Sequence, residues 1–470
     1  MKTTRNALLC WAMLILAVPA AADSPTRIVL FFADDLGYGE TGCQGNPEIP
    51  TPQIDSLAAD GIRFTQGYVC AAYCSPSRAG LISGRIPARF GYHTNVMPHD
   101  PDGTEEGLST DEWTLAESLQ RAGLKTGLIG KWHLGAGPRH HPFRHGFDHF
   151  FGFAHEGRFF VPPPYQGTTT MLRKKPLPAG SVDHRWYSAD GKLIYHDLLG
   201  NEPDYDLNNP ILRGEQTVEE TRDLTTAFTE EAIDFLDQHH EQSFFLMVSW
   251  NAVHSPLQGV DAWVDRFAHI PDVQRRIFAA MLAQMDDGMG RILQRLDAHG
   301  IADDTLVIFL SDNGSPTKEL TSSNAPLRGG KGQYYEGGIR IPFLMRWPNR
   351  LPAGQVFSHP VTALDLYATA AGLVADQQAL ERSDGRDLLP YLTGDQRGPV
   401  HDDLFWCWRD NGAYRRGDWK LVQTRGNWEM FHLGRDPAET TDLRSTQPDQ
   451  FAQLQQQWQS YRNQMPAWPQ

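Results

Sequence analysis

Apolar, β-rich runs alternate with amphipathic helical segments along most of this chain. The strand-like runs lie at residues 27–33, 126–129, 244–250 and 306–310. The helical segments lie at residues 51–60, 113–122, 222–238, 274–298 and 364–373. Alternation of this kind is typical of a parallel sheet, because each strand needs a helical crossover before the next can run in the same direction. We therefore predict an α/β fold with a large, mostly parallel central sheet flanked by helices.

Polar residues directly follow four of the predicted strands. These groups are Asp34 with Asp35, residues 130–133, residues 251–254, and Asp312 with Asn313. The carboxyl ends of parallel strands meet at one edge of a sheet, so we expect the four groups to lie close together there. Lys131 and His133 are two residues apart and would point the same way in an extended chain.

The pattern changes after about residue 374. Short β-like runs separated by turns precede a closing helix at residues 451–464; the runs lie at 405–408, 413–416, 419–423 and 428–432. We expect a catalytic α/β domain at 23–374 and a small C-terminal α+β subdomain at 375–470 that carries a short antiparallel sheet. Residues 162–209 are rich in proline, glycine and polar residues. They are predicted to form a long insertion over the site, with a hairpin at about 187–195.

The first 22 residues have the pattern of a signal peptide. Lys2 and Arg5 precede an apolar run at residues 7–18, and small residues follow up to Ala22. The run is short for a bilayer span, so we predict cleavage after Ala22 and export to the periplasm or the medium, with an uncleaved anchor as the alternative. No later stretch is long and apolar enough to span a membrane. The net charge of −15 over 470 residues argues against nonspecific nucleic-acid binding.

Cys74 begins the most specific motif, Cys-Ser-Pro-Ser-Arg at residues 74–78, which a helical run and the pair Ser83-Gly84 follow. This motif resembles the signature of the formylglycine-dependent sulfatases, in the arylsulfatase, N-acetylgalactosamine-6-sulfatase and bacterial polysaccharide sulfatase branch of the alkaline phosphatase superfamily. In that family the cysteine is oxidised enzymatically to formylglycine, so the resemblance implies a formylglycine-generating maturation enzyme as a partner. Alternative interpretations of the segment are a disulfide between Cys70 and Cys74 or a capped helix after a loop cysteine.

Other segments resemble the same family from about residue 27 to residue 443. They are the first strand and its aspartates at 32–39, the Gly-Lys-Trp-His-Leu-Gly segment at 130–135, the histidine segment at 251–257, the second lysine loop at 327–332 with 336–342, and the C-terminal segments at 418–421, 429–433 and 436–440.

A hard metal ion is expected beside Cys74. Asp34 and Asp35 would repel each other unless a cation neutralised them. With Asp312 and Asn313 they form an oxygen-rich set that suits Ca²⁺ or Mg²⁺ rather than zinc. The resemblance favours Ca²⁺ and adds the modified Cys74 to its ligands.

The resemblance also implies how the nucleophile acts. Residue 74, as a hydrated aldehyde, offers two hydroxyl groups, and one of them attacks the sulfur atom. Asp312 is expected to take the proton of the attacking hydroxyl, and Arg78 to hold the diol in place. Without the second hydroxyl, release of sulfate would need external water.

Four further residues are expected to bind and release the sulfate group. The resemblance assigns Lys131, Lys331 and His254 to the sulfate oxygens, and His254 or Lys331 to protonation of the leaving sugar oxygen. His133 is expected to remove a proton from the second hydroxyl, so that sulfate is expelled.

Two other functions are compatible with the same fold. One is a phosphatase, phosphodiesterase or phosphonate monoester hydrolase, although two-zinc members usually have histidines among their metal ligands, whereas Asn313 follows Asp312 here. The other is a noncatalytic carbohydrate-binding protein, which the loss of an essential position would support.

A signal peptide and a glycan-handling fold suggest a sulfated polysaccharide or its oligosaccharides as the substrate. Loop residues near the motifs are candidate sugar contacts, each of which is also compatible with an ordinary loop role; they are His93, His99, His155, Arg158 and His184. The insertion at residues 162–209 is where we expect substrate selectivity to lie.

Overall fold

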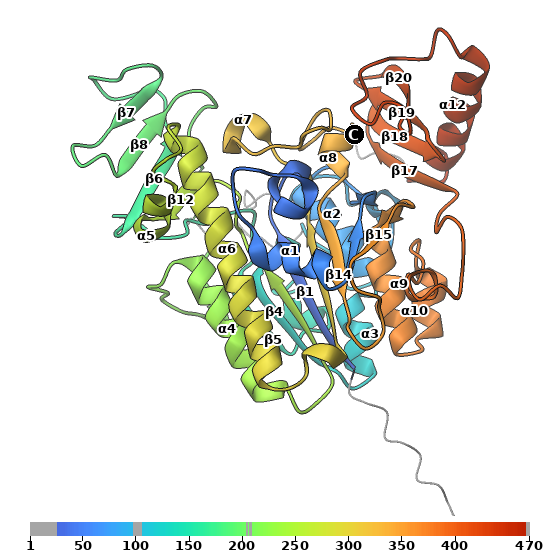
Figure 1. The fold of residues 1–470 in the computed structure, drawn as a ribbon, viewed down its shortest axis with the longest axis horizontal. Coiled ribbons are helices and arrows are strands. Elements are labelled where there is room, and N and C mark those ends of the chain that lie inside the picture. Colours follow the sequence, from blue (N-terminus) through green and yellow to red (C-terminus); the bar gives the residue numbers. More distant parts are fainter. Residues whose placement is uncertain (1–25, 97–105, 204, 206–208, 467–470) are drawn as a thin grey trace, which may run out of the picture.

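The predicted large, mostly parallel sheet forms the centre of the molecule (Figure 1). This computed structural model describes residues 26–96, 106–203, 205 and 209–466, so the predicted signal peptide at 1–22 and His99 lie outside the described residues. Five neighbouring strands, β5, β4, β11, β1 and β13, run parallel to one another. In spatial order the sheet contains β10 (Gln216–Thr217), β9 (Leu212–Arg213), β5 (His149–Phe153), β4 (Lys125–Lys131), β11 (Phe244–Ser249), β1 (Arg27–Ala33), β13 (Thr305–Ser311), β14 (Phe343–Arg346), β2 (Ile62–Phe64) and β15 (Gln355–Phe357).

Helices cover both faces of this sheet (Figure 1). Every residue of β1 is buried, as expected for a central parallel strand covered on both sides. Ile28, Leu30 and Phe32 face one apolar cluster, and Val29 and Phe31 face the other. The helices are α1 (Pro52–Ala59), α2 (Cys74–Ser83), α3 (Leu115–Arg121), α4 (Leu224–His239), α5 (Asp261–Val264), α6 (Val273–Ala298), α7 (Thr317–Leu320), α8 (Glu336–Ile339), α9 (Leu364–Leu373), α10 (Gln377–Arg382), α11 (Leu389–Leu392) and α12 (Pro448–Arg462).

The insertion at residues 162–209 is more regular than the loop that its composition predicted. It contains β6 (Thr168–Arg173), β7 (Arg185–Tyr187) and β8 (Leu193–His196), and β7 and β8 form the expected hairpin. A strand from outside the insertion, β12 (Leu257–Val260), pairs with β6. The resulting four-stranded sheet stands to one side of the central sheet (Figure 1). The strand β12 begins shortly after residues 251–254, so the insertion is joined directly to one of the polar groups.

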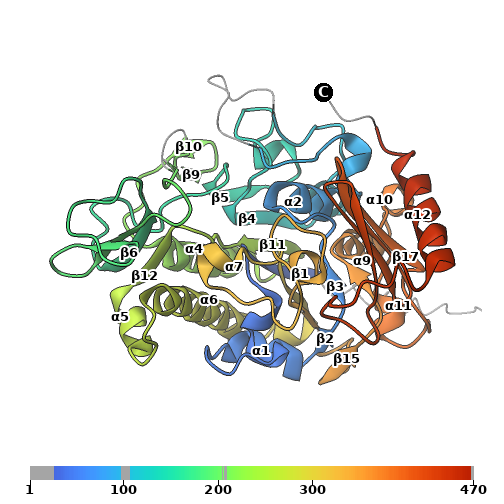
Figure 2. The ribbon, with the colours of Figure 1, turned by 90° about the horizontal axis from the view of Figure 1, so that it is seen from above.

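The C-terminal part carries the predicted antiparallel sheet, with α12 packed on one face (Figures 1 and 2). Phe405 and Cys407 contribute to the small core under α12, whereas Trp406 belongs to the large core of the central sheet. This alternation follows from the period-2 geometry of a strand. The strands are β17 (Asp403–Trp408), β18 (Asn411–Arg416), β19 (Trp419–Thr424) and β20 (Asn427–His432). Two short strands, β3 (Gly67–Tyr68) and β16 (Val361–Thr362), pair separately.

None of the helices within the described residues is long and apolar enough to cross a membrane.

Candidate active site

The four polar groups that follow the central strands meet at one edge of the sheet. Asp34 follows β1 and Asp312 follows β13, and β1 pairs in parallel with both β13 and β11. The backbone N–H of Asp35 donates to Asp312 Oδ1 at 3.1 Å, which joins the two aspartate groups directly. The strand β4 extends two residues further than predicted, so Lys131 is its last residue rather than part of the following loop. Figure 2 shows α2 beside this edge, next to β4 and β11.

Cys74 is the first residue of α2 and is fully buried. Its Sγ lies 3.8 Å from Asp35 Oδ1. Burial, with a smaller contribution from Asp312, raises the pKa of the Cys74 thiol well above its usual value. Among the described residues Cys43, Cys70, Cys74 and Cys407 are free, so the alternative disulfide between Cys70 and Cys74 is absent. Because the thiolate is the reactive form of cysteine, the raised pKa makes the unmodified Cys74 thiol a weak nucleophile.

Arg78 lies one helical turn after Cys74 and is held on several sides. Its Nε and Nη2 donate to Asp312 Oδ2 at 3.0 and 2.8 Å, and its Nη1 donates to Ser249 Oγ at 2.7 Å and to the Lys131 carbonyl at 3.1 Å. Burial opposes the charge of Arg78, but Asp312 and Asp34 outweigh it and raise the pKa of the guanidinium. Ser249, the last residue of β11, gives no signal in the sequence that would single it out.

Two lysines bring positive charge to the carboxylates from different parts of the chain. Lys131 Nζ lies 2.6 Å from Asp34 Oδ2, and both side chains are inaccessible to solvent. Lys331 Nζ lies 2.9 Å from Asp35 Oδ2, and the Lys331 side chain is 15% exposed. Burial opposes the charge of Lys331, but Asp35 and Cys74 outweigh it and raise its pKa well above the usual value. Lys331 is therefore the lysine that an entering substrate can meet first.

His254 faces Asp35, and its contact with Ser255 determines which ring nitrogen carries the proton. Its Nε2 lies 3.6 Å from Asp35 Oδ2, and its Nδ1 lies 2.7 Å from the carbonyl oxygen of Ser255. Because a carbonyl oxygen can only accept, Nδ1 carries a proton. The Nε2 atom is thereby directed toward the carboxylate cluster, where it can exchange a proton with a bound ester.

His133 is buried, and neither ring nitrogen has a hydrogen-bond partner within the described chain. Burial, reinforced by the positive charges of Lys131 and Arg78, lowers the pKa of His133 well below its usual value, which keeps the ring neutral. The expectation of an extended segment is wrong at this residue, since His133 has a left-handed backbone with φ of 57°. Its amide instead donates to the carbonyl of Ala154 at 3.0 Å, beyond the end of β5.

The oxygen atoms of this cluster fit a hard cation. Asp34 Oδ1 and Asn313 Oδ1 are buried and accept no hydrogen bond within the described residues, a costly arrangement for polar atoms. Burial and the neighbouring charge of Asp34 raise the pKa of Asp312, so an added positive charge would relieve the repulsion. Carboxylate and amide oxygens are the ligands that Ca²⁺ prefers.

A second grouping overlaps this oxygen set. Donor atoms of Asp34, Asp35, Cys74 and His254 lie within 4.8 Å of one another. His254, expected at the sulfate oxygens, is thus close enough to join the metal-binding atoms, whereas Asp312 Oδ2 is directed at Arg78. The ligand set of Asp34, Asp35, Cys74, Asp312 and Asn313 remains a prediction.

The candidate sugar contacts are dispersed. His155 is buried, and its amide donates to Asn209 Oδ1. Arg158 donates to the carbonyl of Asn209. His184 is 70% exposed and pairs with Asp197 at 3.0 Å within the sheet of the insertion. Burial lowers the pKa of His93 to about 4.

A network that the sequence did not reveal joins the insertion to the site. Arg173, at the end of β6, has Nη1 3.2 Å from Glu319 Oε1, and Ser255 Oγ donates to the same oxygen at 2.6 Å. Tyr205 OH lies 3.3 Å from Ser255 Oγ. Because Ser255 directly follows His254, the insertion contacts the segment that holds this histidine. These residues come from three separate segments and form no motif.

Comparisons with known proteins decide the family. The family model described as Sulfatase matches residues 26–376, which is well over half of the chain. This chain belongs to the sulfatase family. A second family model, described as N-sulphoglucosamine sulphohydrolase, C-terminal, matches residues 330–465 of the sulfatase. The resemblance that the motifs indicated is therefore confirmed.

Two curated relatives and one solved structure give the extent of the similarity. The sulfatase is 33% identical to steryl-sulfatase of Homo sapiens over 458 residues, which cover 87% of this chain and 76% of that protein. It is 32% identical to N-acetylgalactosamine-6-sulfatase of Homo sapiens over 467 residues, which cover 90% and 82%. The crystal structure of Ps i-CgsB in complex with k-i-k-neocarrahexaose superposes with a TM-score of 0.81 at 31% identity, covering 94% of both chains. The sulfatase is accordingly a sulfuric ester hydrolase.

Proposed function

We propose that this sulfatase hydrolyses sulfate esters on a polysaccharide or its oligosaccharides, with formylglycine made from Cys74 as the nucleophile and one bound Ca²⁺. The observation that carries this proposal is the cluster around Cys74. Its Sγ lies 3.8 Å from Asp35 Oδ1, and Lys331 Nζ lies 2.9 Å from the other oxygen of the same carboxylate. A nucleophile, an oxygen-rich cation site and a lysine that solvent can reach therefore share one small volume.

Two of the relatives support a glycan substrate. N-acetylgalactosamine-6-sulfatase is named for a sulfated sugar, and the Ps i-CgsB structure contains an oligosaccharide. The insertion contacts the His254 segment, because Arg173 pairs with Glu319 and Tyr205 lies beside Ser255. It therefore supplies surface beyond the sulfate-binding atoms. We propose that this surface selects the sugar, and that residues 1–22 direct export to where such glycans occur.

Two groups supply chemistry that the unmodified side chains lack. Formylglycine, once hydrated, supplies the hydroxyl nucleophile, and Ca²⁺, when bound by Asp34, Asp35, Asp312, Asn313 and residue 74, supplies Lewis acidity and a fixed anchor for the ester.

The surrounding residues then position groups and move protons. Arg78, fixed by Asp312 and Ser249, holds residue 74 in place through the first turn of α2. Asp312 accepts the proton of the attacking hydroxyl. His133, kept neutral by burial and nearby cations, accepts the second proton as sulfate is released.

Cations and a histidine act on the ester itself. Lys131 and Lys331 offset the negative charge that builds on the nonbridging oxygens. When Nε2 of His254 also carries a proton, it donates to a sulfate oxygen, and either this Nε2 proton or one of the Lys331 ammonium protons passes to the leaving sugar oxygen. The Ser255 carbonyl supports this role, because it fixes the proton on Nδ1 and so orients Nε2 toward the site.

Peptide mass spectrometry tests the nucleophile. Trypsin cleavage after Arg63 and Arg78 yields one peptide, residues 64–78, that contains both Cys70 and Cys74. We expect fragment ions that place an aldehyde at residue 74 and a thiol at residue 70, in protein made by a host that matures other sulfatases. Cys70 is the internal control, because it shares the peptide and is buried as well. An unmodified thiol at residue 74 would contradict the proposed nucleophile.

Sulfate release tests the substrate class. We expect the matured protein to release inorganic sulfate from sulfated oligosaccharides, and Cys74→Ala to release none. Phosphate release from matched phosphate esters at a higher kcat/KM than sulfate release would contradict the proposal.

A further inference from the structure

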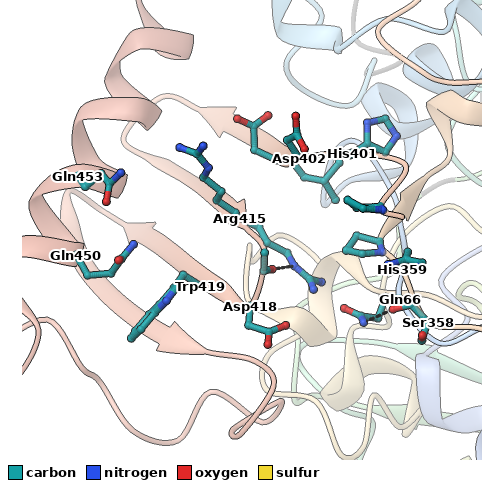
Figure 3. Close-up of a pocket in the computed structure, with 16 residues that line it drawn as sticks. Gln66, Ser358, His359, His401, Asp402, Arg415, Asp418, Trp419, Gln450 and Gln453 are labelled. Carbon is teal, nitrogen blue, oxygen red and sulfur yellow. Dashed lines mark hydrogen bonds between the residues drawn. The ribbon is translucent and has the colours of Figure 1, made fainter. Parts of the chain in front are cut away.

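A cleft of about 570 Å³ lies between the C-terminal sheet and the catalytic part of the chain, and none of its lining residues belongs to the cluster around Cys74. We call it the C-terminal cleft. Figure 3 shows its two walls: Gln450 and Gln453 of α12 lie with Trp419 of β19 on one side, and Gln66, Ser358 and His359 lie on the other. Both walls are fixed to the same core, because Trp406 of β17 donates to the carbonyl of Val69 at 2.7 Å.

The lining is rich in polar side chains that form no hydrogen bond or ion pair with another described residue, although the His359 ring packs edge to face on Phe357 with centroids 5.5 Å apart. Six lining side chains form no hydrogen bond or ion pair within the described residues. They are those of Asp402, Asp418, Arg416, His359, Gln450 and Gln453. The neighbouring Asp403 and Arg415 differ, since Asp403 accepts from Tyr414 at 2.7 Å and Arg415 donates to the Gly417 carbonyl at 2.9 Å. Six planar groups that can donate or accept are therefore available to a ligand in one cleft.

Trp419 supplies an apolar surface among these polar groups. The residue is partly exposed, and its ring meets His432 edge to face with centroids 4.8 Å apart. This contact fixes the indole, so little conformational entropy is lost when a ligand covers it. An immobilised aromatic face surrounded by amide and carboxylate groups suits a sugar, whose C–H face is apolar and whose edge carries hydroxyl groups.

The net charge of the C-terminal cleft favours uncharged sugars over sulfated ones. Its lining contains Asp402, Asp403 and Asp418 against Arg415 and Arg416, which leaves one excess negative charge with the histidines neutral. The whole chain carries a net charge of −15. A heavily sulfated stretch would be repelled by both, whereas an uncharged, hydroxyl-rich stretch would not.

We propose that the C-terminal cleft binds an unsulfated stretch of the polysaccharide chain, as a noncatalytic site that is separate from the cluster around Cys74. The proposal rests on the polysaccharide substrate proposed above. Strand β17 connects the two places, because Asp403 lines the cleft while Trp408 packs against Tyr73, next to Cys74, with ring centroids 5.4 Å apart. Five residues of extended strand span roughly 17 Å. This separation is within the length of a polysaccharide chain, so the proposal includes one glycan chain held at both places, which raises the effective concentration of ester at the catalytic site.

Binding is tested on the Cys74→Ala protein, which cannot turn over. The probes are neocarrahexaose, its chemically desulfated form, and unsulfated hexasaccharides of galactose, glucose, mannose, xylose and fucose, each titrated by calorimetry. We expect saturable binding of at least one unsulfated probe, weakened at least tenfold by Trp419→Ala and severalfold by Gln453→Ala. Gln453 is exposed on α12, so its variant leaves the fold intact even if Trp419→Ala does not.

Trp263→Ala is the matched control, because Trp263 is also a partly exposed tryptophan but lies on α5, outside the cleft. It should bind as the parent does. The proposal is overturned if no unsulfated probe binds, if Gln453→Ala and Trp419→Ala bind as the parent does, or if the sulfated probe binds more tightly through Trp419 than its desulfated form.

Turnover measurements distinguish a failure of the cleft proposal from a failure of the proposed function. In the matured protein, Trp419→Ala should leave kcat/KM for a small aryl sulfate within twofold of the parent and raise KM for a polymeric substrate. Equal KM values on the polymer would overturn the role in substrate capture. A matured protein that releases no sulfate would contradict the proposed function, while the calorimetry would still decide the cleft.

Discussion

Lys420 Nζ lies 2.7 Å from Glu336 Oε1, and neither side chain is accessible to solvent. The same ammonium group lies 2.9 Å from Glu439 Oε1, and Glu439 accepts from the Glu336 amide at 2.6 Å. Burial would raise the pKa of Glu336, but Lys420 and Arg340 outweigh it and lower the pKa to about 2. Because Glu336 begins α8, directly after the loop that contains Lys331, the C-terminal sheet holds the Lys331 loop in place through this contact.

Removal of Lys420 should therefore destabilise the protein. We expect Lys420→Met to lower the free energy of unfolding by about 3–5 kcal/mol, because it removes the buried ammonium from Glu439 and from one oxygen of Glu336 and leaves Glu336 paired with Arg340 alone among the described residues. Urea denaturation measures this change. The control is Arg144→Met, which breaks a 3.1 Å pair with Glu215 in which both side chains are 53% exposed, and which should cost less than about 1 kcal/mol. Equal costs for the two variants would show that the buried contact is not a principal anchor.

Strand β4 offers a matched pair of lysines for testing the site. Lys131 ends the strand beside Asp34, whereas Lys125 begins it and is 42% exposed. We expect Lys131→Ala to lower kcat for a small aryl sulfate by roughly 10²–10³-fold, because a cation directed at the developing charge is lost. Lys125→Ala should remain within twofold. Circular dichroism must confirm that Lys131→Ala is folded, and a folded variant with parental kcat would exclude Lys131 from catalysis.

Calcium should stabilise the protein even when Cys74 is unmodified. Among the residues that the structure describes, Asn313 Oδ1 and Asp34 Oδ1 are buried and have no hydrogen-bond partner, so they are available to a cation. After chelation and dialysis, a fixed Ca²⁺ concentration of 100 times the parent's Kd should add about 2.7 kcal/mol to the parent's free energy of unfolding, measured as a rise in Tm. Asn313→Ala should reduce the rise, and Asn349→Ala, at an exposed position, should not. A rise of the same size in Asn313→Ala would remove Asn313 from the ligand set.

Asp286 should make stability depend on pH. It lies on α6 and accepts hydrogen bonds from the amides of Gln53 and Ile54 at the start of α1. Burial, with the nearby charges of Asp55 and Asp287, raises its pKa to about 7. The native carboxyl thus holds its proton more tightly than the unfolded one, so the stability it contributes is present below about pH 4 and is lost as pH rises through about 7.

Asp286→Asn keeps one acceptor oxygen and removes the titration. Relative to the parent, this variant should become more stable by up to about 4 kcal/mol between pH 4 and pH 8, since one pKa unit corresponds to about 1.4 kcal/mol. Urea midpoints at the two pH values measure the difference. Parallel pH profiles for the two proteins would show that Asp286 does not titrate in this range.

The sequence by itself determined the central strands and the polar residues that follow them. The runs at 27–33 and 364–373 coincide with β1 and α9, because buried strands and helices carry their pattern locally. The meeting of Asp34 and Asp312 at one edge followed from the parallel order alone. Composition was less informative at residues 162–209, where proline and glycine predicted a loop, but pairing with β12 built a sheet.

Only the tertiary structure decided the contacts that join distant segments. Lys420 meets Glu336 from 84 residues away, and Arg173 meets Glu319 across a gap of 146 residues. Neither pair has a spacing that a strand or helix would impose, so no periodicity reveals it. The C-terminal cleft likewise exists only because α12 and the turn between β18 and β19 pack opposite the segments after β2 and β15. Packing between elements sets these distances, whereas local sequence sets only which residues each element can offer.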